Sequence, residues 1–174
     1  MSNQSFPFHY ESAAMVNAPV DQVFAYLDDP KAMSAHMGKS TMMMAVSRML
    51  IDIDSDGGRV VGSKIRMQGL MMSIRLSLEE VITERQVPFR KVWETIGTPK
   101  LLGIAHYRMG FELTPTGALS MARVFIDYSL PPSMPGSWLG RLFSGFYARW
   151  CTKRMVDDAT GHFDSMRLSS RISR

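Results

Sequence analysis

The chain has 174 residues, of which 45% are apolar and 21% are charged. This length suits one domain, and the composition is that of an ordinary globular protein, which excludes wholesale disorder. The formal net charge is +4, and residues 136–174 account for all of it, because seven Arg and Lys residues stand there against three Asp residues.

Several classes of protein are disfavoured by simple features. The single cysteine, Cys151, excludes an internal disulfide and a cysteine-based zinc site. No apolar run approaches the roughly 18 residues of a membrane span. Residues 1–7 lack the basic start and apolar core of a secretory signal. We therefore expect a cytoplasmic protein with no metal and no cofactor.

The first elements are predicted from capping residues and periodicity. Residues 9–17 are typical of a strand. Pro19 suits the first position of a helix, and the apolar residues that follow have helical spacing; they are Val20, Val23, Phe24 and Leu27. A second short helix is expected after Pro30, with Met33 and Met37 on one face and its end before Gly38.

From Thr41 onward the apolar pattern changes to period two, which is typical of strands. Short turns rich in Gly, Pro and Asp separate the strands, so an antiparallel meander is predicted. The expected strands cover residues 43–53, 61–68, 70–79, 90–96, 105–113 and 122–130.

Prolines at 131, 132 and 135 end the predicted sheet, and a helix of about thirty residues is expected next. Its apolar stripe begins with Leu139, Leu142, Phe143, Phe146 and Trp150. Near residues 151–154 the stripe is expected to change phase, continuing as Val156, Ala159, Phe163 and Met166. We assign residues 1–8 to an N-terminal arm, 9–167 to one domain and 168–174 to a basic, frayed tail.

Three stretches of sequence carry a resemblance to a known family. They are residues 17–30 (Asn-Ala-Pro-Val-Asp-Gln-Val-Phe-Ala-Tyr-Leu-Asp-Asp-Pro), 90–94 (Arg-Lys-Val-Trp-Glu) and 106–111 (His-Tyr-Arg-Met-Gly-Phe). With the order of elements, they resemble the START-like or SRPBCC superfamily, which includes polyketide cyclase/dehydrase and lipid transport-like proteins. The resemblance implies an α+β helix-grip fold. In that fold a curved seven-stranded antiparallel sheet surrounds a long C-terminal helix, and two short helices lie between strands 1 and 2.

The resemblance also implies a cavity for apolar ligands, without a shared set of catalytic residues. Sixteen methionines suit such a cavity, since Met adapts to irregular apolar surfaces. The strand faces and the helix give the candidate ligand-binding residues, which are Met49, Met67, Met72, Ile74, Trp93, Tyr107, Met109, Phe111, Ile126, Tyr128, Leu142, Phe143, Phe146 and Trp150.

One end of the predicted meander is unusually apolar. Counting turns along the chain brings segments 38–42, 68–71, 97–103 and 131–136 to that end, with methionines and leucines in or beside them. Because turns normally face water, this cluster indicates a pocket mouth, or a tip that contacts a membrane or a partner. Local capping of the core is the alternative.

No catalytic motif is found. The sequence lacks a nucleophile elbow, a phosphate-binding loop and paired histidines one helical turn apart. His36 is the best single candidate for an acid or base, although a packing role is the commoner one for such a histidine. Tyr107 and Tyr128 could offer hydroxyl groups to a ligand.

These observations leave three functions open. The first is binding or transport of a small hydrophobic ligand, such as a lipid, an isoprenoid or an aromatic polyketide-like molecule. The second is a polyketide cyclase or aromatase-like enzyme that uses the same cavity. The third is a membrane-associated or protein-interaction module. The basic C-terminal segment could contact an anionic membrane, whereas nucleic acid is not expected because exposed aromatics do not interleave its charges.

Overall fold

The computed structural model describes residues 5–30, 46–71, 74–101, 103–131 and 138–172. In chain order the elements are β1 (Phe8–Val16), α1 (Val20–Asp28), β2 (Val46–Ile53), β3 (Lys64–Met71), β4 (Ile74–Gln86), β5 (Arg90–Lys100), β6 (Tyr107–Thr116), β7 (Leu119–Tyr128) and α3 (Trp138–Ile172). The second short helix expected after Pro30 falls on residues 31–45, outside the described residues.

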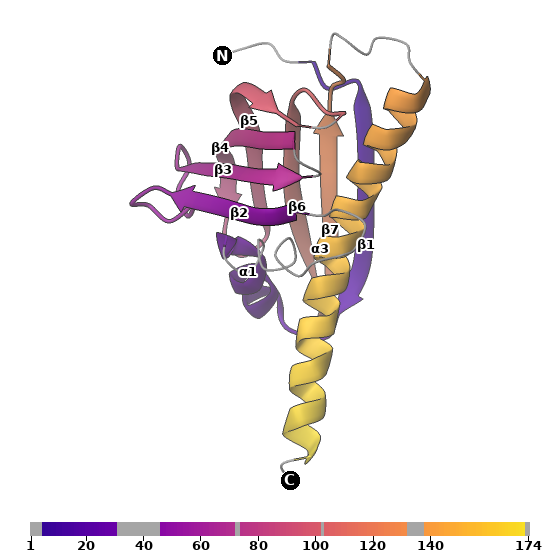
Figure 1. Cartoon of the computed structure of the whole chain (residues 1–174). Coiled ribbons are helices and arrows are strands. Elements are labelled where there is room, and N and C mark those ends of the chain that lie inside the picture. Colours follow the sequence, from indigo (N-terminus) through magenta and orange to yellow (C-terminus); the bar gives the residue numbers. More distant parts are fainter. Residues whose placement is uncertain (1–4, 31–45, 72–73, 102, 132–137, 173–174) are drawn as a thin grey trace.

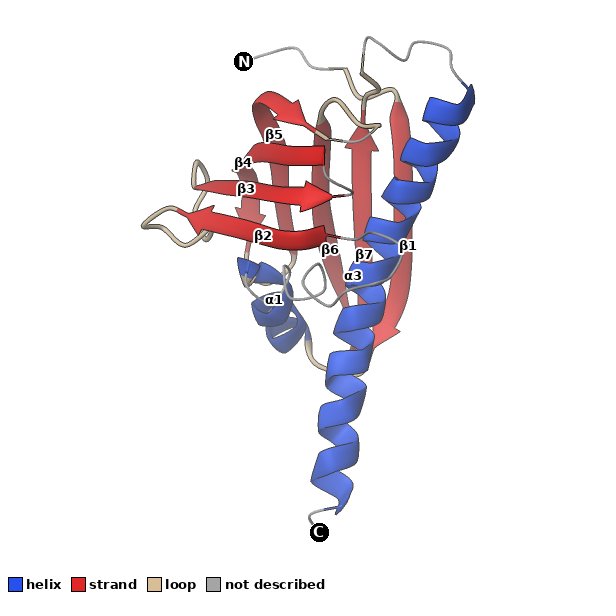
Figure 2. Ribbon diagram, viewed as in Figure 1, coloured by secondary structure: helices blue, strands red, loops and turns tan. Residues whose placement is uncertain are grey.

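The strands form one antiparallel sheet of seven strands in the order β1-β7-β6-β5-β4-β3-β2. The sheet curves so that β2, β3 and β4 turn away from β1 and β7, while α3 runs along the hollow side (Figures 1 and 2). Strand alternation directs apolar side chains to that side, where every second residue of β7 is buried, from Ala122 to Tyr128. The predicted sheet and closing helix are confirmed.

The core lies between the concave face, α1 and α3. Phe111 of β6 is fully buried and contacts Phe24 of α1 edge to face, with 5.5 Å between ring centroids. The ring of Trp93 of β5 also contacts Phe111 edge to face, with 6.5 Å between ring centroids. Aromatic contacts of this kind fix the position of α1 over the sheet.

The packing of α3 corrects the sequence prediction. Leu142 and Phe146 are 63% and 51% exposed. The buried stripe instead keeps one helical phase and consists of Ser144, Ala148, Thr152, Met155, Val156, Ala159 and Phe163. The expected change of phase near 151–154 is therefore wrong.

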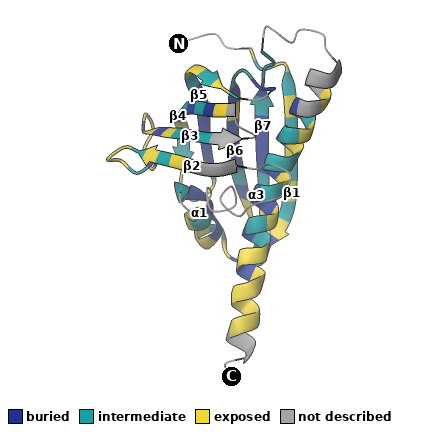
Figure 3. Cartoon of the chain, viewed as in Figure 1, coloured by how far each residue is buried: buried dark blue, intermediate teal, exposed yellow. Residues whose placement is uncertain are grey.

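Small side chains explain this orientation of α3. The helix packs against β1, where Ser12 Oγ and Thr152 Oγ1 lie 3.0 Å apart, and bulky residues would keep the two backbones farther apart. The helix also continues to Ile172, and its last turns extend past the sheet as an exposed segment (Figure 3).

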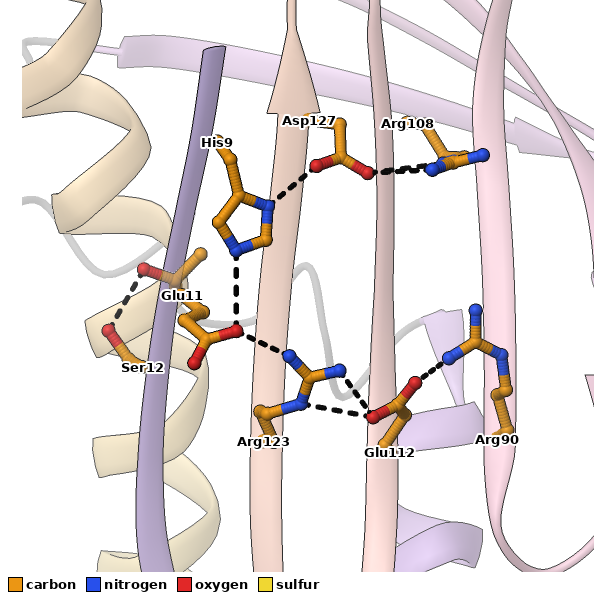
Figure 4. Close-up of polar contacts among 9 residues, drawn as sticks. His9, Glu11, Ser12, Arg90, Arg108, Glu112, Arg123 and Asp127 are labelled. Atoms are coloured by element: carbon orange, nitrogen blue, oxygen red, sulfur yellow. Dashed lines mark hydrogen bonds and ion pairs between the residues drawn. The ribbon is translucent and has the colours of Figure 1, made fainter. Parts of the chain in front are cut away.

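Charged residues cover the opposite, convex face of the sheet (Figure 4). We call them the outer charge network: His9, Glu11, Arg90, Arg108, Glu112, Arg123 and Asp127. They alternate in sign across neighbouring strands, as in the ion pair between Arg123 Nη2 and Glu112 Oε2 at 2.6 Å. This face is therefore solvated, and the apolar face looks inward.

Candidate functional site

A cavity of about 100 Å³ lies between the concave face of the sheet, α1 and α3. Most of its wall is apolar, formed by Leu27, Pro30, Ile51, Ile65, Met67, Ile82, Trp93, Met109, Ile126 and Met155. The polar members of the wall are Asp28, Glu80, Lys91, Tyr107, Tyr147 and Cys151. An apolar cavity with a few converging polar groups is the usual form of a small-molecule site.

The cavity brings together some of the residues predicted from the sequence. Those in its wall are Met67, Trp93, Tyr107, Met109 and Ile126. Their contact with a ligand stays a prediction. Phe111 and Tyr128 are buried in the core beside the wall.

The candidates from α3 are placed differently. Leu142 and Phe146 do not line the cavity, because the small residues of the helix face the sheet and these two point outward. Trp150 is half-buried, and its ring lies 6.3 Å from that of Tyr147. The side chains of Met49, Ile74 and Phe143, and the whole of Met72 and His36, lie outside what the structure describes.

Glu80 is the most unusual residue of the wall. It lies on β4 between Leu78 and Ile82, which face the core, and it is only 5% exposed. The hydroxyl of Tyr107 donates a hydrogen bond to its Oε1. Burial raises the pKa of Glu80 to about 7, although hydrogen bonds from Tyr107 and Trp93 and the charge of Lys91 oppose this shift. Glu80 therefore gains and loses its proton near neutral pH.

Tyr107 holds Glu80 from the first residue of β6. Its own backbone is fixed by Thr95 of β5, whose Oγ1 accepts a hydrogen bond from Tyr107 N at 3.0 Å and donates one to Tyr107 O at 3.3 Å. Burial and the neighbouring Glu80 raise the pKa of Tyr107 well above its usual value. The phenol consequently stays neutral and serves as a hydrogen-bond donor.

A buried ion pair forms a second polar part of the wall. Lys91 of β5 donates hydrogen bonds from Nζ to Asp28 Oδ1 at 2.7 Å and to the Asp28 backbone oxygen at 3.1 Å. Arg85 of β4 donates to the same carboxylate at 2.8 and 3.2 Å. Burial lowers the pKa of Lys91, and Asp28 opposes that shift. Burial alone would raise the pKa of Asp28, but the bonds from Arg85 and Lys91 lower it.

Helix α3 contributes Tyr147 and Cys151, which form a hydrogen bond with each other. Burial raises the pKa of Cys151 to about 12. At neutral pH the thiol is therefore protonated and a poor nucleophile. Cys151 acts as part of the cavity wall and supplies no reactive thiolate.

Sequence reasoning missed Glu80, Lys91 and Asp28. Asp28 directly follows Leu27, the last apolar residue of the first expected helix, and the apolar alternation of the expected strand 70–79 ends at Leu78. Continuing that alternation by one step places Glu80 on the apolar face, followed by Ile82. A carboxylate in such a position is a detectable signal of a buried acid.

Other predicted features stay untested. At the apolar end of the meander, residues 38–42, 102 and 132–136 lie outside the described part of the chain, so its role as a mouth or tip stays a prediction. Contact of the basic C-terminal segment with an anionic membrane remains a prediction; Arg167 lies on the exposed end of α3 and donates a hydrogen bond to Asn17. Within the described ranges, neither helix has the length and apolar character needed to span a membrane.

Solved structures share this fold at low sequence identity. The crystal structure of Ara h 8.0201 has a TM-score of 0.63 at 11% identity, with 91% of this chain and 98% of that chain covered. Norcoclaurine synthase from Thalictrum flavum, solved with dopamine and hydroxybenzaldehyde, has a TM-score of 0.62 at 16% identity, covering 93% of this chain and 87% of that one. A START superfamily protein from Mycobacterium smegmatis has a TM-score of 0.62 at 11% identity, covering 91% and 98%.

These likenesses establish the helix-grip architecture and leave the chemistry open. No curated protein sequence matches the chain significantly. The sequence model of one family does match, over residues 7–164, which is most of the chain. The chain therefore belongs to the polyketide cyclase/dehydrase and lipid transport family.

Proposed function

We propose that this protein binds a small apolar molecule in the cavity between the sheet, α1 and α3. The observation that carries the proposal is the wall itself, in which apolar side chains surround a few buried polar groups. Burial of apolar area supplies the binding free energy, and the polar groups orient the ligand. The family description, which includes lipid transport, supports ligand binding.

Among a lipid, an isoprenoid and an aromatic polyketide-like molecule, the cavity favours a compact ring compound. Its volume of about 100 Å³ is small for a long acyl chain. Trp93, Tyr107 and Tyr147 offer aromatic surfaces to a flat ligand. Glu80 and Tyr107 can form hydrogen bonds with an oxygen atom of that ligand.

Native mass spectrometry tests the proposal. We expect the purified protein to carry a small apolar molecule, or to take up β-tetralone, a flat bicyclic ketone. Met67→Trp should abolish this binding because Met67 is a half-buried part of the wall. Met121→Trp is the matched control, since Met121 is exposed on β7 and is not part of the wall. Absence of any bound or acquired molecule in the unmodified protein would contradict the proposal.

A second candidate function is an enzyme of the cyclase or aromatase type acting in the same cavity. The observation that favours it is Glu80, a buried carboxyl whose pKa of about 7 suits acid–base catalysis at neutral pH. A ligand carrier with an apolar cavity needs no such group. Loss of a chemical step in Glu80→Gln, with binding retained, is the expected sign of this function.

A further inference from the structure

Two ionisable side chains of opposite sign line the same apolar cavity from neighbouring strands. Glu80 lies on β4 and Lys91 on β5, and they are 5% and 4% exposed. Burial of a charge destabilises a fold unless partners compensate for it, and simple ligand binding requires neither group. Their presence in one cavity therefore indicates chemistry in addition to binding.

We propose that Glu80 and Lys91 make the cavity an acid–base site for ketones, in which Glu80 removes a proton from the carbon next to the carbonyl group and Lys91 stabilises the oxygen that becomes negative. The inference rests on the proposed function, because the ketone must first bind in the cavity. It adds the class of substrate and the role of each residue.

The step balances without any other reactant. The Glu80 carboxylate takes the proton, and the electron pair of the broken C–H bond forms a carbon–carbon double bond. The π electrons of the carbonyl move to its oxygen, which gives an enolate hydrogen-bonded to the Lys91 ammonium. Return of the proton to the same carbon restores the ketone, and return to another carbon of a conjugated enolate shifts a double bond.

Glu80 has the free lone pairs that a base needs. An ionised carboxylate offers about four lone-pair positions, and the hydrogen bonds from Tyr107 and Trp93 use two of them. Tyr107 is a positioning residue here, because its hydroxyl orients the carboxylate and its backbone is fixed by Thr95. The base is thus held before the ligand arrives.

Lys91 has a donor left for the ligand. An ammonium group carries three N–H bonds, and Asp28 accepts two hydrogen bonds from it. Within the part of the chain that is described, no third partner contacts Nζ. Asp28 is also bonded by Arg85, so two cations share one carboxylate. Positive charge is therefore in excess around the Asp28 carboxylate, and the low dielectric of the cavity strengthens the attraction of the Lys91 ammonium for an enolate oxygen.

Hydrogen–deuterium exchange of β-tetralone measures the step directly. The ketone is incubated with the protein in D2O, and NMR follows loss of the hydrogens next to the carbonyl group. We expect the protein to accelerate exchange over buffer, and Glu80→Gln to reduce the protein-catalysed rate by about 100-fold or more. Lys91→Met should reduce it as well. Glu79→Gln is the matched control, because the neighbouring Glu79 pairs with Lys64 and Arg66 on the outer side of the strand, and it should keep the full rate.

The pH profile gives a second readout that a purely structural role would leave unchanged. The rate should rise with pH and level off above about 7, as Glu80 ionises. Tyr107→Phe removes a hydrogen bond that lowers the pKa of Glu80, so its profile should move to higher pH. This variant also tests the inference if Glu80→Gln fails to fold.

Failures of the two proposals are distinguishable. Saturation-transfer NMR shows whether β-tetralone contacts the protein. If the ketone binds but exchange stays at the buffer rate, the acid–base inference is overturned and ligand binding stands. Exchange in Glu80→Gln equal to that of the unmodified protein also overturns the inference. If the ketone does not bind at all, both the inference and the proposed compact ring ligand are overturned.

Discussion

Both faces of the sheet carry charged residues, but those on one face are exposed to water and those on the other are buried. On the convex face, the outer charge network spans β1, β7, β6 and β5 in contact with water (Figure 4). On the concave face, Asp28, Glu80 and Lys91 are buried against an apolar cavity. Water screens the charges of the convex face, so each ion pair there contributes little to stability. Burial strengthens the electrostatic interactions of the concave face. Burial, and not the number of ion pairs, distinguishes the face that carries the proposed site.

The outer charge network has a structural task of its own. Phe125 of β7 points to the convex side and yet is only slightly exposed. The guanidinium groups of Arg90 and Arg123 lie 5.4 and 5.7 Å from the centroid of its ring. Their charges are in turn balanced by Glu112. The network thus covers an aromatic ring that would otherwise face water.

The largest difference between the faces is expected from removal of one carboxylate on each. Asp28→Ala leaves the buried Lys91 without its partner and should lower the free energy of unfolding by about 3–5 kcal/mol. Glu112→Ala on the convex face should lower it by about 1 kcal/mol or less. Urea denaturation of both variants checks this, and equal losses would show that the two faces do not differ as argued.

The next effect concerns the pH dependence of stability. The pKa of Glu80 rises from its usual 4.5 to about 7 on folding, so its contribution is fully present below pH 4.5 and is lost as pH rises through about 7. The unmodified protein should lose about 3 kcal/mol of unfolding free energy across this interval, relative to Glu80→Gln.

Denaturation of both proteins at pH 4.5 and pH 8 tests this, with Glu79→Gln as control. The Glu79 side chain is partly exposed on the outer side of the strand, so this control should follow the unmodified protein. Parallel stability curves for Glu80→Gln and the unmodified protein would mean that Glu80 keeps an ordinary pKa in the fold.

The sequence predicted the sheet well because alternation is a local property. In β7, Ala122, Val124 and Ile126 occupy every second position, and all three are buried on the concave side as expected. The long helix was predicted, but its buried face was not. Hydrophobicity favoured Phe146, whereas the closeness of α3 to β1 selected the small residues Ser144 and Ala148.

The candidate site was predicted only in its apolar part. Met67, Met109 and Ile126 follow from strand faces, and they line the cavity. The polar part depends on pairing between distant residues. Asp28 and Lys91 are 63 positions apart in the chain, and only the packing of α1 on the sheet brings them together. Glu80 alone carried a local signal, through its place in an apolar alternation.

Gly110 of β6 packs closely against the backbone of Lys91 and the ring of Phe125. Its replacement should have an effect on stability between those of the buried and the exposed charged residues. A Cβ atom at this position would lie 2.6 Å from the backbone oxygen of Lys91 and 2.9 Å from Cζ of Phe125. Gly110→Ala should therefore lower the free energy of unfolding by about 1–3 kcal/mol, because backbone and ring must both move. Gly161→Ala on α3 is the matched control, because a Cβ atom added there would have open space around it, and this variant should not lower the free energy of unfolding. If the Gly110→Ala variant were as stable as the unmodified protein, β5 and β6 would have to adjust freely.

The smallest effect is expected from His9, at the edge of the outer charge network. Its Nδ1 lies 2.6 Å from Asp127 Oδ1, and that hydrogen bond raises the pKa of His9. The raised pKa means that the pairing stabilises the fold at low pH and is lost as pH rises through the pKa of the folded state. The side chain is 51% exposed, so solvent screening limits the effect of His9→Gln to about 0.5 kcal/mol at pH 6. At pH 8, or at pH 6 in high salt, the variant and the unmodified protein should unfold alike. A loss that persists under both conditions would show that His9 acts through packing, and the contrast between a screened outer face and a buried inner one would then need a different cause.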